Sequence, residues 1–578
     1  MAFQVSPGIN ISEQDLTTVV PNVATTIGAM AGGFQWGPVL ERTQIGTEND
    51  LVDIFGKPNA DTFEWFWTAA NYLAYGNNLW VVRNVGANAL NAVVGDDDAG
   101  TAVLAKNKDH YDGVTFTDQL FVAKYPGELG NSLKVQAIDV DGWADSTVNA
   151  EFIANFDGPP GTSPDVANAN GSASFVANDE MHVLVTDEGG LWTGTPGYVL
   201  EKHAFVSKAS DAKKFDGSSN YVVNVMRNES KYAYVGNVLQ FTTNSTGTEK
   251  AAGLAKTGGA FLTFNSSTAS ESVPGGSMTL GVDDNTMTDS LLQAGFTLYQ
   301  TPEVVDITLL LGGASAPATT GRWIIDNIAA TRKDCMAFVS PASTSVVNNS
   351  GSEVTALTTD NTALGSSNYA VMDSAWKYQY DRYRDTFMYV PMNGDIAGLC
   401  ARTDYSHDSW WSPAGLNRGT IKNIVKLSWE ATKANRDTMY PLSINPIITQ
   451  TGAGVVLWGD KTMQVVPSAF DRINVRRLFI VLEKAIAVAA KAMLFEFNDE
   501  FTRAQFVNMV APFLREVQGR RGITDFKVVC DSSNNTGQII DTNQFVGDIF
   551  IKPARSINYI QLNFIAARSD VSFSEIGG

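Results

Sequence analysis

The residues with the widest chemical range in this sequence are its histidines, because a histidine can bind a metal ion, move a proton or activate a nucleophile. They are His110, His182, His203 and His407. No two of them lie within four residues, which excludes an HExxH zinc motif. His407 has Asp404 and Asp408 as neighbours, a composition that suits a catalytic dyad. A histidine that hydrogen-bonds within a loop is far commoner, and we expect that role for His407.

Three other segments resemble ligand-binding loops without completing their patterns. GTEKAAGLAKT (247–257) resembles a phosphate-binding loop but lacks a lysine directly after its second glycine. DVDG (139–142) and GDDD (95–98) begin like calcium loops, but neither continues to a glutamate at the twelfth position. No GxSxG nucleophile motif occurs. We therefore expect turns here and assign no catalytic, cofactor-binding or metal-binding residue.

The composition is that of a large folded protein with several domains. The chain has 578 residues, of which 44% are hydrophobic and 18% charged. Its formal net charge of −20 argues against a nucleic-acid-binding protein, since such proteins present basic surfaces to phosphate. Three widely spaced cysteines, Cys335, Cys400 and Cys530, exclude a disulfide scaffold and a zinc cluster. We expect a protein made in a reducing compartment.

Export and membrane insertion are not expected from the sequence. The first ten residues lack the basic region and apolar run of a signal peptide. The longest apolar stretch, 478–495, contains Glu483, Lys484 and Lys491, which a membrane span would not tolerate.

Charge is distributed unevenly along the chain. Residues 86–300 hold 26 acidic and 12 basic residues, whereas residues 466–568 hold 10 acidic and 13 basic residues. An acidic middle and a mildly basic C-terminal part suggest different surroundings, although a solvated acidic surface is the preferred explanation of the first.

The N-terminal part predicts an extended arm followed by an α/β layer. Residues 1–22 show no helical apolar period and are interpreted as an arm outside the core. Apolar runs predict strands at 25–33 and 79–85. Strands that alternate with helices favour an α/β layer.

Two helices are predicted between these strands from their end signals. Thr47 and Asp50 resemble a capping box that opens a helix ending at Phe55. Asp61 is expected to cap a second helix that runs to Tyr75.

The acidic middle, 86–300, predicts mainly β structure inserted into the α/β layer. HVLVT (182–186) and YVVNVM (221–226) are short segments that we interpret as strands. Two stretches rich in small polar residues, 157–180 and 242–285, are expected to be long loops.

The α/β pattern returns after residue 300. Strands are predicted at 304–312, 335–341, 454–459, 526–531, 544–552 and 557–566, and helices at 321–332, 417–438, 471–495 and 500–518. Aromatic clusters at 63–67 and 377–390 carry no basic surplus, so packing in a core or an interface explains them better than nucleic-acid stacking.

Eight blocks of the sequence, in order along the chain, resemble one family. They are SPGINISEQDLTTVVPNVATTIGAMAGGFQWGPV (6–39), DLVDIFGKPN (50–59), YPGELGNSLKV (125–135), KYQYDRY (377–383), DIAGLCARTD (395–404), SPAGLNRG (412–419), PSAFDRINVRRLF (467–479) and IKPARSINYIQLNF (551–564). The family is that of the tail sheath proteins of contractile-tailed bacteriophages of the T-even type. The sequence departs from it between 81–85 and 125–130, where large relatives carry an outward-projecting domain. That domain is expected to be reduced, or relocated to 150–280.

The resemblance implies an α/β (α+β) fold with several domains. The inner C-terminal α/β domain is built from both ends of the chain, and mainly β domains are inserted in the middle. The expected parts are an N-terminal arm at 1–22, a middle α/β domain at 23–120 and 286–345, an inserted outward-facing region at 121–285, the inner sheath domain at 346–566, and a C-terminal tail or arm at 567–578.

The resemblance also implies a structural protein of the virion rather than an enzyme. Such proteins form hexameric rings stacked helically around a tail tube, assemble in the host cytoplasm, and shorten to drive the tube through the host envelope for genome ejection. The implied partners are further copies of the chain, the tail tube protein, and baseplate and tail terminator proteins, with no cofactor, nucleic acid or inserted membrane segment. Two alternatives stay open: a related contractile device, such as a phage-tail-like bacteriocin or secretion sheath, and an enzyme or receptor-binding protein on an α/β scaffold.

Inter-subunit residues follow from the exposed arms and the terminal alternating strands, since unguarded strand edges invite strands from another chain. The candidates for donated or accepting strands are Val5, Ile9, Ile11, Val19, Phe550, Ile557, Tyr559, Ile560, Leu562 and Phe564. The candidates for charged contacts to a neighbour or to the tube are Arg472, Arg476, Arg477, Arg515, Arg520 and Arg521. Pairing within one subunit is the competing role for these arginines.

Overall fold

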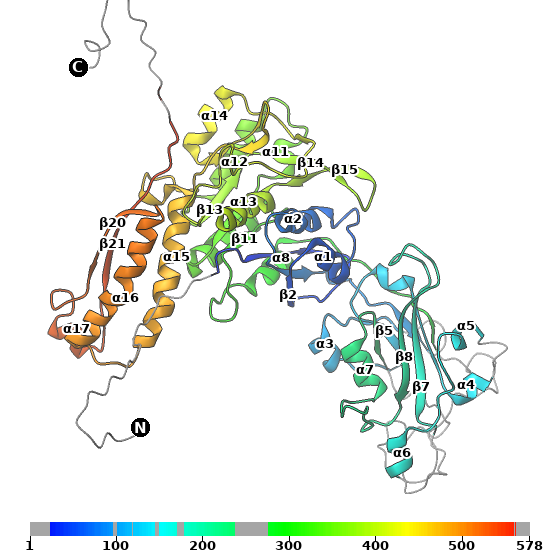
Figure 1. Ribbon diagram of the computed structural model, residues 1–578. Helices are drawn as coiled ribbons and strands as arrows, with labels where there is room; N and C mark the ends of the chain where they lie inside the picture. Colours follow the sequence, from blue (N-terminus) through cyan, green and yellow to red (C-terminus); the bar gives the residue numbers. More distant parts are fainter. Residues whose placement is uncertain are drawn as a thin grey trace, which may run out of the picture. The chain divides into compact units, whose positions relative to one another are not determined.

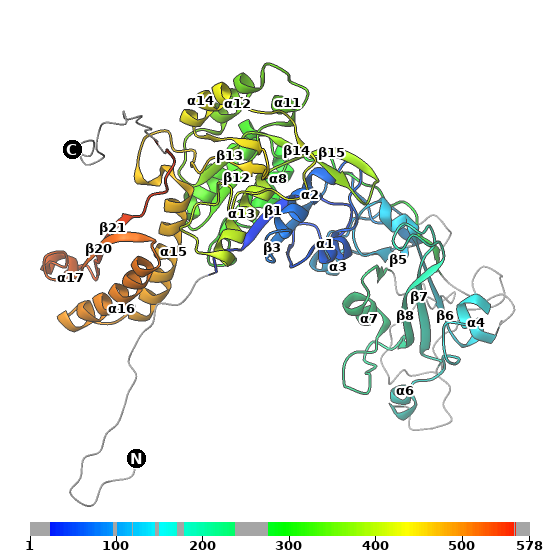
Figure 2. The ribbon, with the colours of Figure 1, turned by 45° about the horizontal axis from the view of Figure 1, so that its top comes forward.

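The computed structural model describes residues 24–95, 101–117, 119–144, 150–169, 178–236, 275–559 and 561. The chain divides into two compact units (Figures 1 and 2). The larger unit comprises Ala24–Ser406 and Pro413–Val466, and the smaller unit combines His407–Ser412 with the chain from Pro467 onward. None of the helices in the described ranges is long and apolar enough to cross a membrane.

A seven-stranded sheet forms the centre of the larger unit. Its order is β17 (Ile444–Asn445), β13 (Ala370–Asp373), β12 (Met336–Val339), β11 (Leu309–Leu311), β1 (Gly28–Gly33), β3 (Leu79–Asn84) and β2 (Arg42–Ile45). All neighbouring strands pair in parallel except β2 and β3. Its central strands are buried from end to end, because a parallel sheet is covered on both faces.

Helices from distant parts of the sequence cover this sheet or pack on the helices that cover it. They are α1 (Glu48–Phe55), α2 (Phe63–Leu73), α8 (Asp289–Thr297), the helical segment 317–332, α11 (Ser343–Val346), α12 (Glu353–Leu364), α13 (Asn393–Ser406) and α14 (Lys433–Met439). A Cβ on Gly32 would lie 2.5 Å from a ring carbon of Trp65 on α2, whereas one on Gly33 would meet Met287, just before α8. Successive strand residues point to opposite faces, so α2 and the segment leading to α8 lie on opposite sides of β1.

Two small sheets complete the larger unit's α/β part. One has the order β15 (Thr386–Pro391), β14 (Trp376–Asp381) and β16 (Lys426–Leu427), and the other pairs β18 (Ile447–Gln450) with β19 (Gly454–Leu457).

The inserted part of the larger unit is mainly β. Its sheets are β4 (Val93–Gly95), β5 (Gln119–Ala123) and β9 (Ala233–Val235), and β10 (Gly275–Ser277), β6 (Leu133–Ile138), β7 (Glu180–Asp187) and β8 (Tyr198–Ser207). Short helices accompany them: α3 (Lys108–Gly113), α4 (Val140–Ala144), α5 (Ala150–Ile153), α6 (Pro164–Ala169) and α7 (Val222–Glu229). One buried apolar cluster joins the two sheets and α7, which makes the insertion a packed body.

The smaller unit consists of two long helices and a two-stranded sheet. The helices are α15 (Ile473–Ala490) and α16 (Glu500–Gly519), and β20 (Ile523–Val529) pairs with β21 (Asp548–Pro553) in antiparallel fashion. The short helix α17 (Gly537–Asp541) lies between the two strands in sequence. Apolar residues of both long helices and of both strands share one core.

Several local predictions are confirmed. The predicted capping box begins α1: the side chain of Thr47 accepts from the backbone N–H of Asp50, and the side chain of Asp50 accepts from the backbone N–H of Thr47. The strand predicted at 182–186 is β7, and the helices predicted at 471–495 and 500–518 are α15 and α16.

Other local predictions were wrong, for identifiable reasons. Asp61 does not cap α2; the cap position is Thr62, and the side chain of Asn59 accepts from the backbone N–H of both residues. The segment 221–226 enters helix α7, because Val222, Val225 and Met226 are buried at helical spacing.

Corrections also apply to the later elements. The helix predicted at 417–438 is formed only in its last part, by α14, and β16 lies before it; the strand predicted at 304–312 is reduced to β11. The loop predicted at 157–180 contains α6. Of the strand predicted at 557–566, only 557–559 and 561 are described, and they form no strand.

The division predicted at residue 345 does not follow the sheet. β11 and β12 precede that position, β13 and β17 follow it, and all four belong to the seven-stranded sheet. Parallel strands separated in sequence by helices form a single layer, so the α/β part on both sides of residue 345 is one body.

Arg83 connects the central sheet to the insertion through hydrogen bonds. It lies on β3, is 1% exposed, and donates to the carbonyls of Phe34 (2.8 Å), Gly37 (3.0 Å), Gln35 (3.1 Å) and Pro126 (2.8 Å). Burial lowers the pKa of Arg83 to about 10, so it stays charged at neutral pH. Five fixed donors on a planar group suit the bridging of several carbonyls, which one lysine could not reach.

Replacing Arg83 with methionine is expected to destabilise the larger unit by about 3 kcal/mol or more, since each buried carbonyl left without a donor costs about 1–3 kcal/mol. The measurement is the midpoint of its calorimetric unfolding transition. Arg384→Met, at an exposed arginine, is the matched control and should change little. Equal midpoints for the two variants would contradict this role.

Candidate subunit interface

The two-stranded sheet β20–β21 is the first candidate surface. Phe526 and Val528 of β20, with Ile549 and Ile551 of β21, pack against the cores of α15 and α16. Neither strand pairs with a further strand among the described residues, so each presents one edge without a strand partner. An isolated two-stranded sheet is marginally stable in water, and it gains stability from additional strands.

Exposed apolar side chains accompany this sheet. Phe550 on β21 points away from the core and is 59% exposed, and Ile557 and Tyr559 beyond it are 82% and 81% exposed. The other predicted strand residues, Val5, Ile9, Ile11, Val19, Ile560, Leu562 and Phe564, lie outside the described residues.

Three of the six predicted arginines lie around the start of α15. Arg476 and Arg477 are buried, and the guanidinium of Arg476 lies 3.1 Å from Glu483 and 4.8 Å from the ring centre of Phe470. Arg472 lies 3.6 Å from Asp471. These contacts within one copy favour a packing role for Arg476 in particular.

The other three arginines gather at the end of α16. Arg520 forms ion pairs with Asp408 and Glu516, and its guanidinium lies 5.4 Å from the ring centre of Trp410. Arg521 lies 5.5 Å from the ring centre of Trp411, and Arg515 is exposed one turn earlier.

Trp410 joins the two arginine groups at one end of the helix pair. Its carbonyl accepts from the side chain of Asn474 on α15 (3.3 Å), and its indole N–H donates to the carbonyl of Arg520 (3.2 Å). The start of α15 and the end of α16 therefore lie together, as expected of antiparallel neighbouring helices.

The histidines do not form a common site. His407 packs against Trp411, with ring centres 5.1 Å apart, while Asp408 pairs with Arg520. His182 is buried in the insertion, stacked on Phe156, and its ring nitrogens contact the backbone of Gly158 and Phe205. Packing roles explain both.

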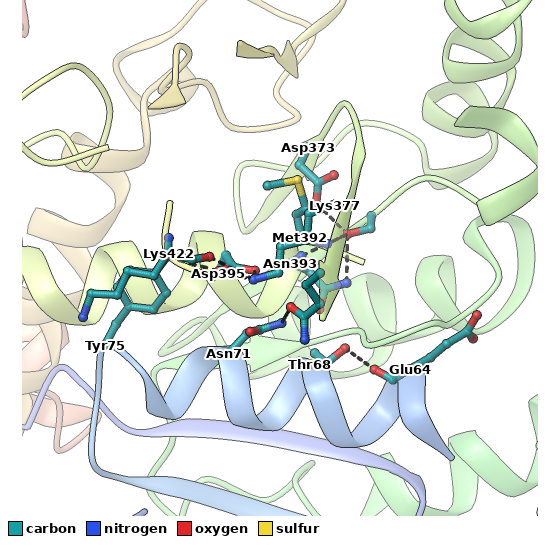
Figure 3. Close-up of polar contacts among 12 residues, drawn as sticks. Glu64, Thr68, Asn71, Tyr75, Asp373, Lys377, Met392, Asn393, Asp395 and Lys422 are labelled. Carbon is teal, nitrogen blue, oxygen red and sulfur yellow. Dashed lines mark hydrogen bonds and ion pairs between the residues drawn. The ribbon is translucent and has the colours of Figure 1, made fainter. Parts of the chain in front are cut away.

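A buried ion pair lies at the centre of the larger unit (Figure 3). The ammonium of Lys377 on β14 lies 2.9 Å from Asp395 on α13, and both side chains are fully buried. The hydroxyl of Tyr75 donates to the same carboxylate (3.1 Å) and accepts from the backbone N–H of Lys422 (2.6 Å). Burial lowers the pKa of Lys377 and raises that of Asp395, and the attraction between the charges opposes both shifts.

A second buried carboxyl lies close to this pair. Asp373, at the end of β13, accepts from the hydroxyl of Ser340 (2.6 Å), which in turn accepts from the side chain of Asn393 (2.9 Å). Burial raises the pKa of Asp373 to about 8, and the charge of Asp395 adds to the shift. Asp373 is therefore predominantly protonated at neutral pH.

This network positions elements and offers no reactive group to a substrate. The side chains of Lys377, Asp373 and Asp395 are at most 2% exposed, and the bonds of the network connect the segment just after α2 with α13, β13 and β14 (Figure 3). No group of three or more His, Cys, Asp or Glu residues suited to a metal ion occurs in the part of the chain that the structure describes. Lys377 and Asp395 are the first residues of two of the family-like sequence blocks, 377–383 and 395–404. These blocks are the sequence feature from which the pair could have been found.

Two family models match the chain. The "Phage tail sheath protein central domain" matches residues 309–463, and the "Phage tail sheath C-terminal domain" matches residues 465–567. The second match begins close to Pro467, where the main segment of the smaller unit begins.

Relatives extend the similarity over the whole chain. The tail sheath protein of Vibrio phage KVP40 is 33% identical over 679 aligned residues, which cover 99% of this chain and 100% of that protein. The chain belongs to the tail sheath protein family. The tail sheath protein of Enterobacteria phage T4 is 32% identical over 99% of both chains. Because the alignment with the KVP40 protein is longer than the 578 residues of this family member, that relative contains segments that are missing here.

A solved structure shares the fold. The crystal structure of the sheath tail protein from Listeria innocua matches with a TM-score of 0.53 at 12% identity, covering 93% of this chain and 94% of that one. The mixed α/β, multi-domain class predicted from the sequence is thus confirmed, and tail sheath proteins are components of phage virions.

Replacing Lys377 with methionine is expected to destabilise the larger unit by about 3–5 kcal/mol, because Asp395 is left buried without its cation. Replacing both partners, Lys377→Met with Asp395→Leu, should recover much of the loss. Lys433→Met is the matched control, because Lys433 forms an exposed ion pair with Asp437 within α14. Calorimetric unfolding midpoints check this, and a double variant no better than the single one would contradict it.

The pH dependence of stability should reveal Asp373. Its folded pKa of about 8 lies above the ordinary value of 3.8, so the folded state binds the proton more tightly than the unfolded state. This contribution to stability is complete below about pH 4 and is lost as the pH rises through about 8. As the pH rises from about 4 to about 8, the unfolding midpoint of Asp373→Asn should therefore fall less than that of the natural protein. Parallel plots of unfolding midpoint against pH would contradict the shift.

Proposed function

We propose that this protein is the sheath subunit of a contractile phage tail. Copies stack as hexameric rings around the tail tube and contract to drive the tube through the host envelope. The observation that carries the proposal is identity of 33% and 32%, over essentially the whole chain, to the tail sheath proteins of two phages. The role is structural rather than enzymatic.

A phage tail is favoured over the sheath of a bacteriocin or secretion device. Both of these relatives are phage proteins, and each is matched from end to end. The buried ionisable pair of Lys377 and Asp395 gives no support to an enzyme on the same scaffold, because its complete burial leaves no room for a substrate beside it.

Strand addition is the proposed link between subunits. The arms, residues 1–22 and the segment from Ile557 onward, add strands to the β20–β21 sheet of neighbouring copies. The open edges of this sheet and the exposure of Phe550, Ile557 and Tyr559 support this arrangement. Each backbone hydrogen bond contributes roughly 0.5–1.5 kcal/mol, so a five-residue strand contributes about 2–6 kcal/mol.

The arms also let the assembled bodies rotate. A mesh of donated strands stays intact during contraction if only the connecting segments near 18–24 and 552–558 bend. The globular units move as bodies, because interiors as closely packed as the Lys377 network do not deform continuously.

The partners and location follow the same proposal. The inner domain, which includes the smaller unit, faces the tail tube, and the inserted region faces outward. Baseplate and terminator proteins cap the two ends of the sheath, assembly takes place in the host cytoplasm, and no cofactor, nucleic acid or membrane segment takes part. With a net charge of −20 per copy, neighbours attract only through close contacts, since salt screens charges beyond about 8 Å.

Deleting residues 1–22 is expected to abolish polymerisation while leaving the unfolding transitions of the monomer unchanged. The purified full-length chain should form hollow tubes in negative-stain micrographs, and the deletion variant should not. A variant of equal length with residues 1–22 replaced by a Gly/Ser sequence separates loss of the strand from loss of chain length.

Two results would count against this account. A full-length chain that stays monomeric at every salt and protein concentration would contradict the sheath assignment. Tubes formed equally well by the deletion variant would contradict strand addition by the N-terminal arm.

A further inference from the structure

The short segment between α15 and α16 exposes several large apolar side chains. We call residues 494–501, with the sequence LFEFNDEF, the helix-pair loop; they comprise residues 494–499 before α16 and the first two residues of α16. Leu494 is 62% exposed, Phe497 83%, Phe501 75%, and Phe495 is fully exposed. Single exposed apolar residues are ordinary, but four within eight residues form a patch of the kind that binds another protein.

The backbone of this loop is also strained. Phe495 has φ = 72°, in the left-handed region that a bulky side chain rarely adopts. Such strain costs of order 1–3 kcal/mol and persists where the surroundings or a function require it. Here the strained residue directs a phenyl ring into solvent, so the folded monomer gains nothing from it. A contact with another molecule would account for both features.

The charges of the helix-pair loop define what it can bind. Glu496, Asp499 and Glu500 are acidic, and the loop contains no lysine or arginine. Asp499 caps α16 by accepting from the N–H of Thr502 (2.8 Å). No cation of the described chain forms an ion pair with Glu496 or Glu500. A fitting partner therefore combines aromatic surface with basic groups.

The opposite end of α16 has this composition. We call Trp410, Trp411, Arg515, Arg520 and Arg521 the arginine end. Arg520 is occupied by Asp408 and Glu516, but among the described residues no carboxylate pairs with Arg515 or Arg521, and both are exposed. Tryptophan and arginine are the side chains that most often dominate the binding energy of protein interfaces.

One copy cannot bring these two surfaces together. α16 has 20 residues, so its ends lie about 30 Å apart at 1.5 Å per residue. Both surfaces belong to the smaller unit, whose shared core of α15, α16, β20 and β21 holds them at that distance. A contact between them requires two copies and joins different patches, which is the head-to-tail arrangement that builds rings and helical filaments.

We propose that the helix-pair loop of one copy docks on the arginine end of the next copy. This contact rests on the proposed sheath function and adds to it a second, side-chain link between subunits beside the donated strands. The phenyl groups of the loop pack against the exposed parts of the half-buried Trp410 and Trp411, and Glu496 and Glu500 face Arg515 and Arg521.

The first test removes the aromatic contact. Phe495→Asn with Phe497→Ala keeps a residue that tolerates the left-handed conformation and deletes both rings. This variant should need at least tenfold more protein than the natural chain to form sedimentable tubes, with unchanged monomer unfolding. Phe215→Ala is the matched control, because Phe215 is equally exposed but lies in the inserted region.

The second test identifies the partner surface by exchanging charges. Glu496→Arg with Glu500→Arg, and separately Arg515→Glu with Arg521→Glu, should each raise the protein concentration needed for polymerisation. All four substitutions in one chain should restore it, because every copy then carries both reversed surfaces. Polymerisation is measured by sedimentation and negative-stain microscopy.

The outcomes separate this proposal from the one it rests on. If the natural chain forms tubes and the phenylalanine variant forms them equally well, the loop contact is overturned and the sheath function stands. If the fourfold charge variant is no better than either pair, the arginine end is not the partner and the proposal is overturned. Normal tubes that fail to hold tail tube protein would assign the loop to the tube and also overturn it. A natural chain that never polymerises would overturn both proposals.

Discussion

Backbone groups on a strand edge need hydrogen-bond partners, and this requirement organises the smaller unit. β20 and β21 pair with each other, their inner faces are covered by α15 and α16, and each keeps one edge without a strand partner among the described residues. A protein that acts alone guards such edges, whereas one that polymerises can use them. The chain belongs to the tail sheath protein family, and exposed apolar side chains follow β21. Both observations favour this open sheet as the site where the proposed arms would bind.

The larger unit has the opposite character, because its polar groups are paired internally. Lys377 and Asp395 neutralise each other in a dry interior, and Arg83 bonds four carbonyls at the root of the insertion. Such networks make a body that moves as a whole, since removing one partner leaves a buried charge or dipole at high cost. A subunit suited to rearrangement would combine rigid bodies with links that tolerate rotation, and the strand addition proposed above would supply such links.

The sequence predicts those features whose signals are local. The capping box of Thr47 and Asp50 and the apolar stripe of α15 depend on neighbours within a few turns, and both are present. Long-range features escaped prediction. The boundary at residue 345 cut through the central sheet because nothing local shows that β12 and β13 pair. Lys377 and Asp395 were missed as a pair because they lie on different elements, and the exposure of Phe495 depends on a fold that the sequence alone does not display.

Hydrogen exchange of the backbone amides of β20 and β21, compared between monomer and polymer, tests the central claim most directly. If neighbouring copies complete this sheet, amides on at least one open edge should exchange at least tenfold more slowly in the polymer. The central strand β1, buried in the monomer already, should not change and serves as the internal reference. Polymers in which β20 and β21 exchange as fast as in the monomer would contradict the claim that added strands join the subunits.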